Sequence, residues 1–217
     1  MESTMVERRA NSSELSVPFS MNIRSRRGLY SKIIKPILDI IFSICLIVMA
    51  SPIFICIPLL IKLDSKGPIL FKQLRYGEKG RIFNIYKFRT MYVDTPNEGR
   101  SPTSGADPRI TKIGRLLRRT SIDELPQLMN ILKGEMSFIG PRPEQKSIVE
   151  TEYSEWERQR FLAVPGITGL WQISSERIHP IHNNLQYDLK YISEVSLKLD
   201  LKIIWGTFRI LLNSNTH

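Results

Sequence analysis

The sequence predicts a mainly helical α+β protein. We expect a broken membrane helix, followed by a small cytosolic domain with one short β-hairpin and amphipathic helices at the membrane interface. Three observations lead to this prediction. The stretch 33–63 is apolar with few charges, two runs rich in β-branched and aromatic residues flank a glycine-containing turn, and several later segments carry helical periodicity. At 217 residues and 42% apolar composition, the chain is long enough for one compact domain with appendages.

The chain divides into three parts by composition. Residues 1–30 hold few large apolar side chains and several arginines, which is typical of a flexible basic tail. Residues 31–64 form the predicted re-entrant membrane hairpin, and residues 65–217 form the predicted cytosolic and interfacial domain with the candidate catalytic residues. A secretory signal peptide is not indicated, because the apolar stretch starts late and lacks a small-residue cleavage site.

The apolar stretch 33–63 is long for a single straight span. At about 1.5 Å per residue it would measure about 46 Å, against a hydrocarbon core of about 30 Å. Basic residues stand on both sides of it: Arg24, Arg26, Arg27, Lys32 and Lys35 before, and Lys62, Lys66, Lys72 and Arg75 after. A spanning helix would place one of these clusters on the translocated side of the membrane, against the usual bias of basic residues.

Ser51-Pro52 interrupts the apolar stretch, and proline removes an amide donor and clashes with the preceding turn. We therefore predict a helix-break-helix hairpin that enters and leaves the membrane on the cytoplasmic face. A kinked single-pass helix is the alternative, since prolines are tolerated in spanning helices. Inside the hairpin, Asp39 is expected to pair with Lys35, one turn earlier.

The remaining segments are assigned from their periodicity and their turn residues. Strands are predicted over 69–73 and 81–88 around a turn at 77–80, with extended segments at 136–143 and 168–172. Helices are predicted over 111–119, 125–132, 148–161, 185–192 and 197–212. The first of these helices fits either a lipid headgroup surface or a substrate-facing surface. The last helix either joins the core or lies in the membrane interface.

The charge of the chain indicates anionic partners. A net charge of +10 and a pI of about 9.8 fit phosphates, anionic lipid or nucleic acid, and the sign alone does not choose among them. Cys45 and Cys56 both lie in the apolar stretch, so neither suggests a disulfide framework or a zinc site. The sequence contains no glycine-rich phosphate loop and no HExxH or GxSxG motif.

Asp123 and Glu124 are adjacent carboxylates between Arg118 and a helix-forming run. A structural interpretation is a capping box, with Ser121 as the N-cap and Glu124 reaching back to it. At the positive end of a helix and beside arginines, these carboxylates are expected to stay ionised. An ionised carboxylate suits a nucleophile or a metal ligand, whereas a general acid needs a raised pKa.

Other cations complete the candidate site. Arg142 stands between Pro141 and Pro143, whose stiff backbone reduces the cost of fixing a guanidinium on a phosphate; a surface turn is the alternative. Lys87 and Arg89 share one face of a predicted strand, as a second anion clamp or as a solvated edge. Attack of an anion on a phosphate requires Mg²⁺ and arginines to neutralise the phosphate oxygens.

A set of motifs resembles the bacterial sugar transferases known as monotopic phosphoglycosyl transferases. The motifs are the apolar stretch with Ser51-Pro52, Lys87-Phe88-Arg89-Thr90-Met91, Asp107-Pro108-Arg109-Ile110-Thr111, the segment 118–127, Gly140-Pro141-Arg142-Pro143 and Gly169-Leu170-Trp171-Gln172. Each motif is modest alone, but their order together is highly specific. The resemblance covers residues 32–212, nearly the whole chain.

The resemblance implies an activity. Such enzymes transfer a sugar 1-phosphate from a UDP-sugar to undecaprenyl phosphate and release UMP, as the first membrane step of exopolysaccharide, capsule, O-antigen or glycoprotein glycan assembly. It implies that Asp123 is the nucleophile of a covalent phosphosugar intermediate, with Mg²⁺ bound at Asp123. Glu124 would assist proton handling or orient the pair.

The resemblance also implies roles for the cations and for the hairpin. Arg118 and Arg142 would hold phosphate oxygens, and Lys87 and Arg89 would line the site. The apolar stretch would be a re-entrant helix broken at Ser51-Pro52, on the cytoplasmic face of the bacterial inner membrane. The expected partners are the UDP-sugar, undecaprenyl phosphate and an anionic lipid bilayer, without nucleic acid.

One departure from the family pattern concerns the donor. Many relatives read Val-Ser-Gly-Arg after the glutamine that corresponds to Gln172, whereas this chain has Ile173-Ser174-Ser175-Glu176-Arg177. The identity of the sugar is therefore left open. Two alternatives remain: a non-catalytic, membrane-attached basic adaptor that binds anionic lipid, and a glycosyltransferase that attacks the sugar carbon and releases UDP.

Overall fold

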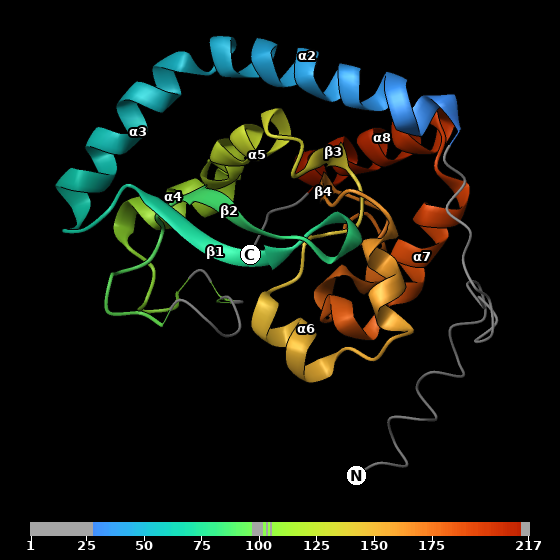
Figure 1. Cartoon of the computed structure of the whole chain (residues 1–217). Coiled ribbons are helices and arrows are strands. Elements are labelled where there is room, and N and C mark those ends of the chain that lie inside the picture. Colours follow the sequence, from blue (N-terminus) through green and yellow to red (C-terminus); the bar gives the residue numbers. More distant parts are fainter. Residues whose placement is uncertain (1–27, 97–101, 103, 105, 214–217) are drawn as a thin grey trace.

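The computed structural model describes residues 28–96, 102, 104 and 106–213, so the predicted tail lies outside the described residues except for its last three positions. A long helical arch lies over a body of short helices and two small sheets (Figure 1). The prediction of a mainly helical α+β protein is thereby confirmed.

The arch consists of a π-helical turn, η1 (Tyr30–Ile34), and two helices, α2 (Lys35–Met49) and α3 (Ser51–Asp64). Taken singly, no helix among the described residues is long and apolar enough to cross a membrane, whereas this pair, bent by 63°, meets those criteria together. The bend lies at Ala50, directly before Ser51-Pro52. Pro52 occupies the first turn of α3, where its missing amide costs no helical hydrogen bond.

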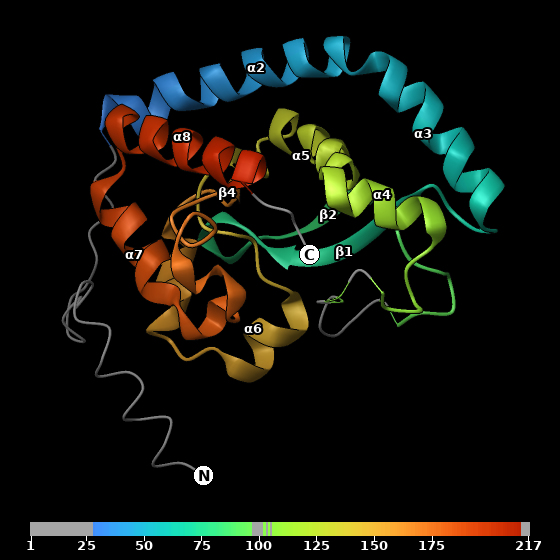
Figure 2. The same cartoon turned by 180° about the vertical axis from the view of Figure 1, so that it is seen from behind.

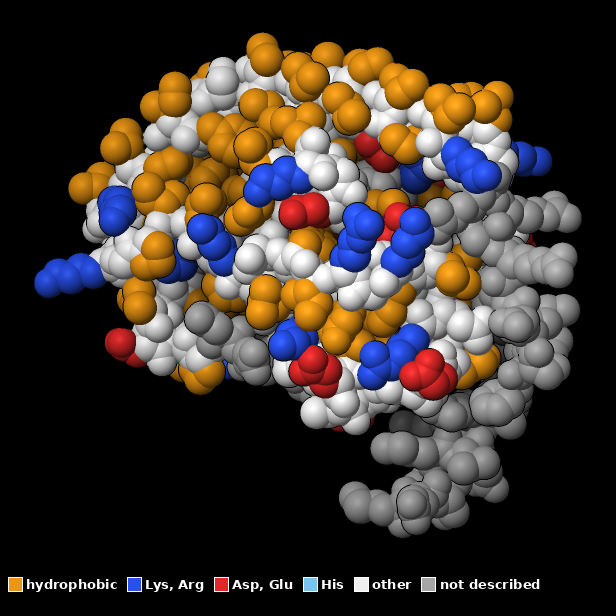
Figure 3. Space-filling model, viewed as in Figure 1, with side chains coloured by type: hydrophobic (Ala, Val, Ile, Leu, Met, Phe, Trp, Pro, Cys, Tyr) orange, Lys and Arg blue, Asp and Glu red, His pale blue; other side chains and the backbone are white. Residues whose placement is uncertain are grey.

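The outer surface of the arch is apolar. Hydrophobic side chains cover it in the space-filling view (Figure 3). The large exposed ones include Ile37, Ile41, Phe42, Ile44, Val48, Met49, Ile55, Leu59 and Leu63. A contiguous apolar surface of this kind marks an interaction site, because water solvates it poorly.

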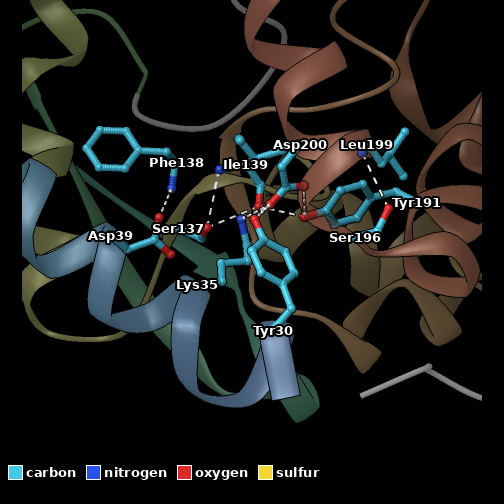
Figure 4. A network of polar contacts seen from close by, with 10 residues as sticks. All are labelled: Tyr30, Lys35, Asp39, Ser137, Phe138, Ile139, Tyr191, Ser196, Leu199 and Asp200. Carbon is cyan, nitrogen blue, oxygen red and sulfur yellow. Dashed lines mark hydrogen bonds and ion pairs between the residues drawn. The ribbon is translucent and has the colours of Figure 1, made fainter. Parts of the chain in front are cut away.

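The inner side of the arch packs on the body. Ile57 and Ile61 of α3 are buried against Phe88 and Leu117. At the other end, Lys35 does not make the expected pair with Asp39; its Nζ lies 2.8 Å from Oδ2 of Asp200 (Figure 4). The Asp39 carboxylate instead accepts a hydrogen bond from the Phe138 amide at 3.2 Å. Lys35 stays within electrostatic reach of Asp39, but the direct contacts of both side chains are to other segments of the chain.

The predicted β-hairpin is present. Strands β1 (Leu70–Tyr76) and β2 (Ile82–Phe88) pair antiparallel around the 3₁₀ turn η2 (Glu78–Gly80), in which Lys79 and Gly80 have positive φ. Phe83 and Ile85 on β2 point into a core with residues of the following helices. β1 extends three residues beyond its predicted end, because register pairing continues to Tyr76.

Helix α4 (Lys112–Thr120) begins where Thr111 Oγ1 accepts a hydrogen bond from the Gly114 amide at 2.9 Å. A Cβ on Gly114 would lie 2.1 Å from the carbonyl oxygen of Thr90, so only glycine allows this close approach to the end of the hairpin. The 3₁₀ helix η3 (Ile122–Gln127) and α5 (Leu128–Leu132) follow. The predicted helix 125–132 therefore forms as two shorter pieces.

A second sheet joins two segments that are distant in sequence. Strand β3 (Ser137–Ile139) pairs parallel with β4 (Gly166–Thr168), and between them lie α6 (Lys146–Glu152) and η4 (Glu157–Leu162). The prediction of one helix over 148–161 is wrong. Glu157 caps the amide of Ser154 at 2.6 Å, and this local capping starts a new helix after α6.

The chain ends in helices. The turns η5 (Ser175–Ile178) and η6 (Ile181–Asn183) precede α7 (Leu185–Glu194) and α8 (Leu197–Asn213). Of the extended segment predicted at 168–172, only Thr168 lies in a strand. Helix α8 runs beside α2 (Figure 2) and joins the core, as one of the two alternatives predicted; a position in the membrane interface stays a prediction. Asp200 and Ile203 are buried, whereas Trp205 and Phe208 are exposed.

Candidate active site

The acidic pair lies on η3, at the start of a new helical segment. Ser121 ends α4 in the left-handed conformation (φ 55°), and its side chain makes no capping hydrogen bond. The capping-box interpretation is therefore wrong; only the Glu124 amide bonds to the Ser121 carbonyl, at 3.2 Å. Ile122 and Leu125 pack into the apolar cluster beneath α3 and so hold η3 in place.

Glu124 lies between two cations from other elements. Its Oε1 is 2.5 Å from Nζ of Lys87 on β2, and 3.8 Å from Nη2 of Arg142, which follows β3. Burial raises the Glu124 pKa, but Lys87 and Arg142 outweigh it and lower the pKa to about 2. Glu124 is thus a fixed anion at neutral pH, which fits an orienting role and not proton handling.

Asp123 differs from its neighbour. It is 9% exposed, and among the residues that the structure describes no other side chain donates a hydrogen bond to it. Burial raises its pKa to about 6, with Lys87 and Arg118 opposing and Glu124 adding to the rise. Burial therefore outweighs the nearby cations. At neutral pH the carboxylate is still mostly ionised, as a nucleophile requires.

Arg118 lies within electrostatic reach of Asp123, and burial lowers its own pKa. Its Nε donates to Oγ1 of Thr90 at 2.9 Å, and its Nη2 approaches the Met91 sulfur at 3.2 Å. These contacts fix the guanidinium against the segment that leaves the hairpin. Arg119, the next residue, is exposed and takes no part.

Arg89 does not join the other cations. Its guanidinium is buried and donates to the carbonyls of Lys66 at 2.5 Å and Ser65 at 2.7 Å, at the C-terminal end of α3. The expected shared face with Lys87 is lost because β2 ends at Phe88. In this structure Arg89 anchors the arch instead of facing Asp123.

Two arginines that the sequence does not single out support the site from behind. Arg75 donates to the Pro143 carbonyl at 3.0 Å, and Arg160 donates to the Arg142 carbonyl at 2.5 Å. Both hold the loop that carries Arg142. No local pattern marks them, since one lies on a strand and the other in a segment that reads as a charged, solvated helix.

The acidic residues set a limit on metal binding. Among the described residues, no group of three or more His, Cys, Asp or Glu side chains could hold a metal ion. Mg²⁺, however, commonly uses one or two carboxylates together with substrate phosphates. The Asp123 carboxylate, without a competing side-chain donor, fits such a site.

Comparison with known proteins identifies the family. The family model described as bacterial sugar transferase matches residues 30–214, and the chain belongs to this family. The undecaprenyl-phosphate glucose phosphotransferase of Komagataeibacter xylinus is 41% identical over 205 residues, which cover 88% of this chain and 38% of that protein.

Two further relatives extend the comparison. The UDP-glucose:undecaprenyl-phosphate glucose-1-phosphate transferase of Escherichia coli K12 is 37% identical over 184 residues, covering 82% of this chain and 40% of that protein. The exopolysaccharide production protein PSS of Rhizobium leguminosarum bv. phaseoli is 39% identical over 186 residues, covering 81% of this chain and 93% of that protein. The chain thus spans about two fifths of the length of the first relatives and nearly all of the last.

Proposed function

We propose that this chain transfers a sugar 1-phosphate from a UDP-sugar to undecaprenyl phosphate through a covalent intermediate on Asp123, and releases UMP. One observation carries the proposal: a buried carboxylate without a side-chain donor lies within reach of Lys87 and Arg118, and its neighbour Glu124 pairs with Lys87 and Arg142. The names of the relatives support the same donor and acceptor classes.

In the first step, an Asp123 carboxylate oxygen attacks the phosphorus that bears the sugar. The bond from that phosphorus to the bridging oxygen breaks, and UMP leaves with the electron pair. In the second step, a phosphate oxygen of the lipid attacks the same phosphorus, and the Asp123 carboxylate leaves. A covalent intermediate lets a water-soluble donor and a lipid acceptor use one site in turn.

The cations have separate tasks in this scheme. The Arg142 side chain is 36% exposed, and its Nη2 lies 3.8 Å from Oε1 of Glu124, which is long for an ion pair. Its guanidinium can therefore turn to a phosphate without losing a tight contact. Lys87 keeps Glu124 ionised and lowers the pKa of Asp123. Mg²⁺, when bound, would be held by Asp123 and the donor phosphates and would neutralise phosphate charge.

The arch supports a location at the cytoplasmic face of the bacterial inner membrane. Its outer surface is apolar, whereas Lys32 and Lys35 stand at one end and Lys62 and Lys66 at the other. A re-entrant insertion keeps all four on one side of the bilayer, in line with the bias of basic residues. The same arch packs on Phe88 and Leu117, next to η3, which would hold Asp123 near the headgroups.

The sugar is open within this proposal. The relatives include proteins named for glucose and, in Aeromonas hydrophila, for N-acetylgalactosamine. The departure at 173–177 folds as a turn, in which the Ser174 hydroxyl accepts from the Glu176 amide at 3.2 Å. A donor panel must therefore cover several UDP-sugars.

The test uses the full chain in lipid nanodiscs with Mg²⁺ and UDP-sugars labelled in the sugar, without acceptor lipid. We expect a labelled protein adduct and an equal amount of UMP. Asp123→Asn should abolish both, whereas Glu155→Gln, at a fully exposed carboxylate, should change neither. Release of UDP would indicate attack on the sugar carbon, and a chain that forms no adduct with any donor would support the lipid-binding adaptor.

The topology has its own test. Cys45 and Cys56 are exposed on the arch, so both are first replaced by alanine. Gly28→Cys and Lys66→Cys are then introduced one at a time, and each is exposed to a membrane-impermeant thiol reagent. Labelling of both from the cytoplasmic side is expected. Labelling from opposite sides would show a single-pass helix.

A further inference from the structure

Arg160 is a fully charged side chain in the interior. It lies in η4, is 2% exposed and is among the largest side chains that are almost completely buried. Burying a guanidinium costs several kcal/mol unless partners replace its water. The structure supplies them: Asp188 lies 2.6 Å from Nη2, and Nη1 donates to the Tyr153 hydroxyl at 2.5 Å.

The Arg160 guanidinium also reaches the loop that carries Arg142. Its Nη2 donates to the backbone carbonyl of Arg142 at 2.5 Å. Arg142 carries the guanidinium that faces Glu124 at 3.8 Å. A buried ion pair, Arg160 with Asp188, therefore holds the backbone of the residue assigned to substrate phosphate.

The loop needs such support because of its sequence. Pro141 and Pro143 have no amide hydrogen, so the backbone around Arg142 lacks two of its donors. Its carbonyls are bound from outside instead. The Gly166 amide donates a hydrogen bond to the Pro141 carbonyl at 2.8 Å, and Arg75 Nη1 donates one to the Pro143 carbonyl at 3.0 Å.

Arg160 completes this set at the central position. The carbonyl of residue 142 is held only where the guanidinium fork can reach Asp188, Tyr153 and the loop together. A lysine has one ammonium group and no planar fork, so it can keep the charge opposite Asp188 but not the whole arrangement. This difference allows charge and positioning to be separated.

We propose that Arg160, oriented by Asp188, is a positioning residue that sets the direction of Arg142 toward the donor phosphate. The inference rests on the proposed function, in which Arg142 binds that phosphate. Arg160 itself does not touch substrate. A loss of Arg160 should therefore act only through Arg142, and mainly on the KM for the UDP-sugar.

A double-mutant cycle tests this dependence in the full chain in nanodiscs. Arg160→Lys is measured with Arg142 intact and in an Arg142→Ala background. We expect kcat/KM to fall about tenfold or more in the first case, chiefly through KM, because small misplacements of a binding group are costly. In the second case we expect a change below about twofold, because the group being positioned is absent.

Arg158→Lys is the matched control. It lies in the same helix and is partly exposed, and its Nε lies 4.0 Å from Oε1 of Glu155. It should change kcat/KM by less than about twofold in either background. Melting temperatures are recorded for every variant. If Arg160→Lys does not fold, Tyr153→Phe, which removes a single hydroxyl, takes its place in the cycle.

The outcomes separate this inference from the proposed function. An equal loss in both backgrounds would mean that Arg160 only stabilises the fold, and an unchanged KM in the Arg160→Lys variant would likewise overturn the positioning role. If Arg142→Ala alone leaves adduct formation and KM unchanged, the phosphate-binding role of Arg142 fails, and the inference fails with it. Loss in the Arg142 variant without loss in the Arg160 variant overturns the inference alone.

Discussion

Two buried clusters of charge in this molecule differ in how completely their groups are hydrogen-bonded. In the cluster that joins the arch to α8, Oδ2 of Asp200 accepts hydrogen bonds from the Tyr30 hydroxyl at 2.6 Å and from Lys35 Nζ at 2.8 Å (Figure 4). Its Oδ1 accepts one from the Tyr191 hydroxyl at 2.9 Å. Both carboxylate oxygens of Asp200 therefore have hydrogen-bond donors. Such a closed network can hold two elements together and leaves nothing for a ligand.

The cluster around η3 is open. Asp123 receives no side-chain donor among the described residues, and Arg142 remains 3.8 Å from Glu124 and partly exposed. Strand β2, η3 and the loop after β3 hold these charged side chains near one another, but their hydrogen-bonding capacity is not filled by one another. The comparison teaches that burial alone does not distinguish the two carboxylates; the absence of a side-chain donor at Asp123 does, and it is the reason for proposing Asp123 as the reactive group.

The largest effect should come from Asp123→Asn. Adduct formation should fall by at least about 10³-fold, because an amide cannot act as the nucleophile. The melting temperature at pH 7.5 should stay or rise. Because the pKa of Asp123 is raised from 3.8 to about 6 in the folded protein, the stability falls as the pH rises between these two values, and at pH 7.5 the ionised carboxylate destabilises the fold. A variant that loses activity only by unfolding would contradict this assignment.

Asp200→Asn should instead lower the stability of the fold. It leaves Lys35 buried without its counter-ion, so we expect the free energy of unfolding to fall by about 3 kcal/mol. The loss is measured by thermal or denaturant unfolding in detergent. Asp107→Asn, which breaks a surface pair with Arg109, is the control and should cost less than about 1 kcal/mol. Equal stability of the two variants would show that the network is not a clamp.

Lys87→Met should shift a pH profile. Asp123 reacts as a carboxylate, so adduct formation should decline as the pH falls through its pKa. Lys87 lowers that pKa, and its removal should move the acid limb to higher pH by about 1 unit. The rate of adduct formation is measured between pH 5 and pH 8 for both proteins at one Mg²⁺ concentration. A shift to lower pH would rule out this electrostatic role.

The smallest kinetic effect is expected for Arg89→Lys. Arg89 holds the carbonyls of Ser65 and Lys66, so the variant should lose about 1 kcal/mol of stability. Its KM for the UDP-sugar should change by less than about twofold, since the guanidinium lies outside the open cluster. A large rise in KM with unchanged stability would restore the phosphate-binding role implied by the family resemblance.

Local pattern was sufficient for much of the fold. Alternating apolar residues predicted the hairpin β1–β2, and the periodicity of 197–212 predicted α8. The predictions failed where one contact decided the backbone. The Glu157 side chain split the predicted helix 148–161, and the left-handed Ser121 replaced a capping box with a turn.

The candidate site was predictable only in part. Asp123, Glu124, Arg142 and Lys87 were singled out by their residue types, and the structure brings them together. Arg160 was not, because a buried arginine and a solvated one look alike in a charged segment. The difference depends on Asp188, which lies far along the chain.

By itself the sequence determined what is local: the apolar stretch with its proline break, the hairpin, the acidic pair and the family motifs. Each depends on residues a few positions apart, whose periodicity and turn chemistry act before the chain is compact. Only the tertiary structure decided which carboxylate is saturated and which is open. Ion pairs between Lys35 and Asp200, or Arg160 and Asp188, join distant segments, and burial, which sets their strength, exists only in the folded protein.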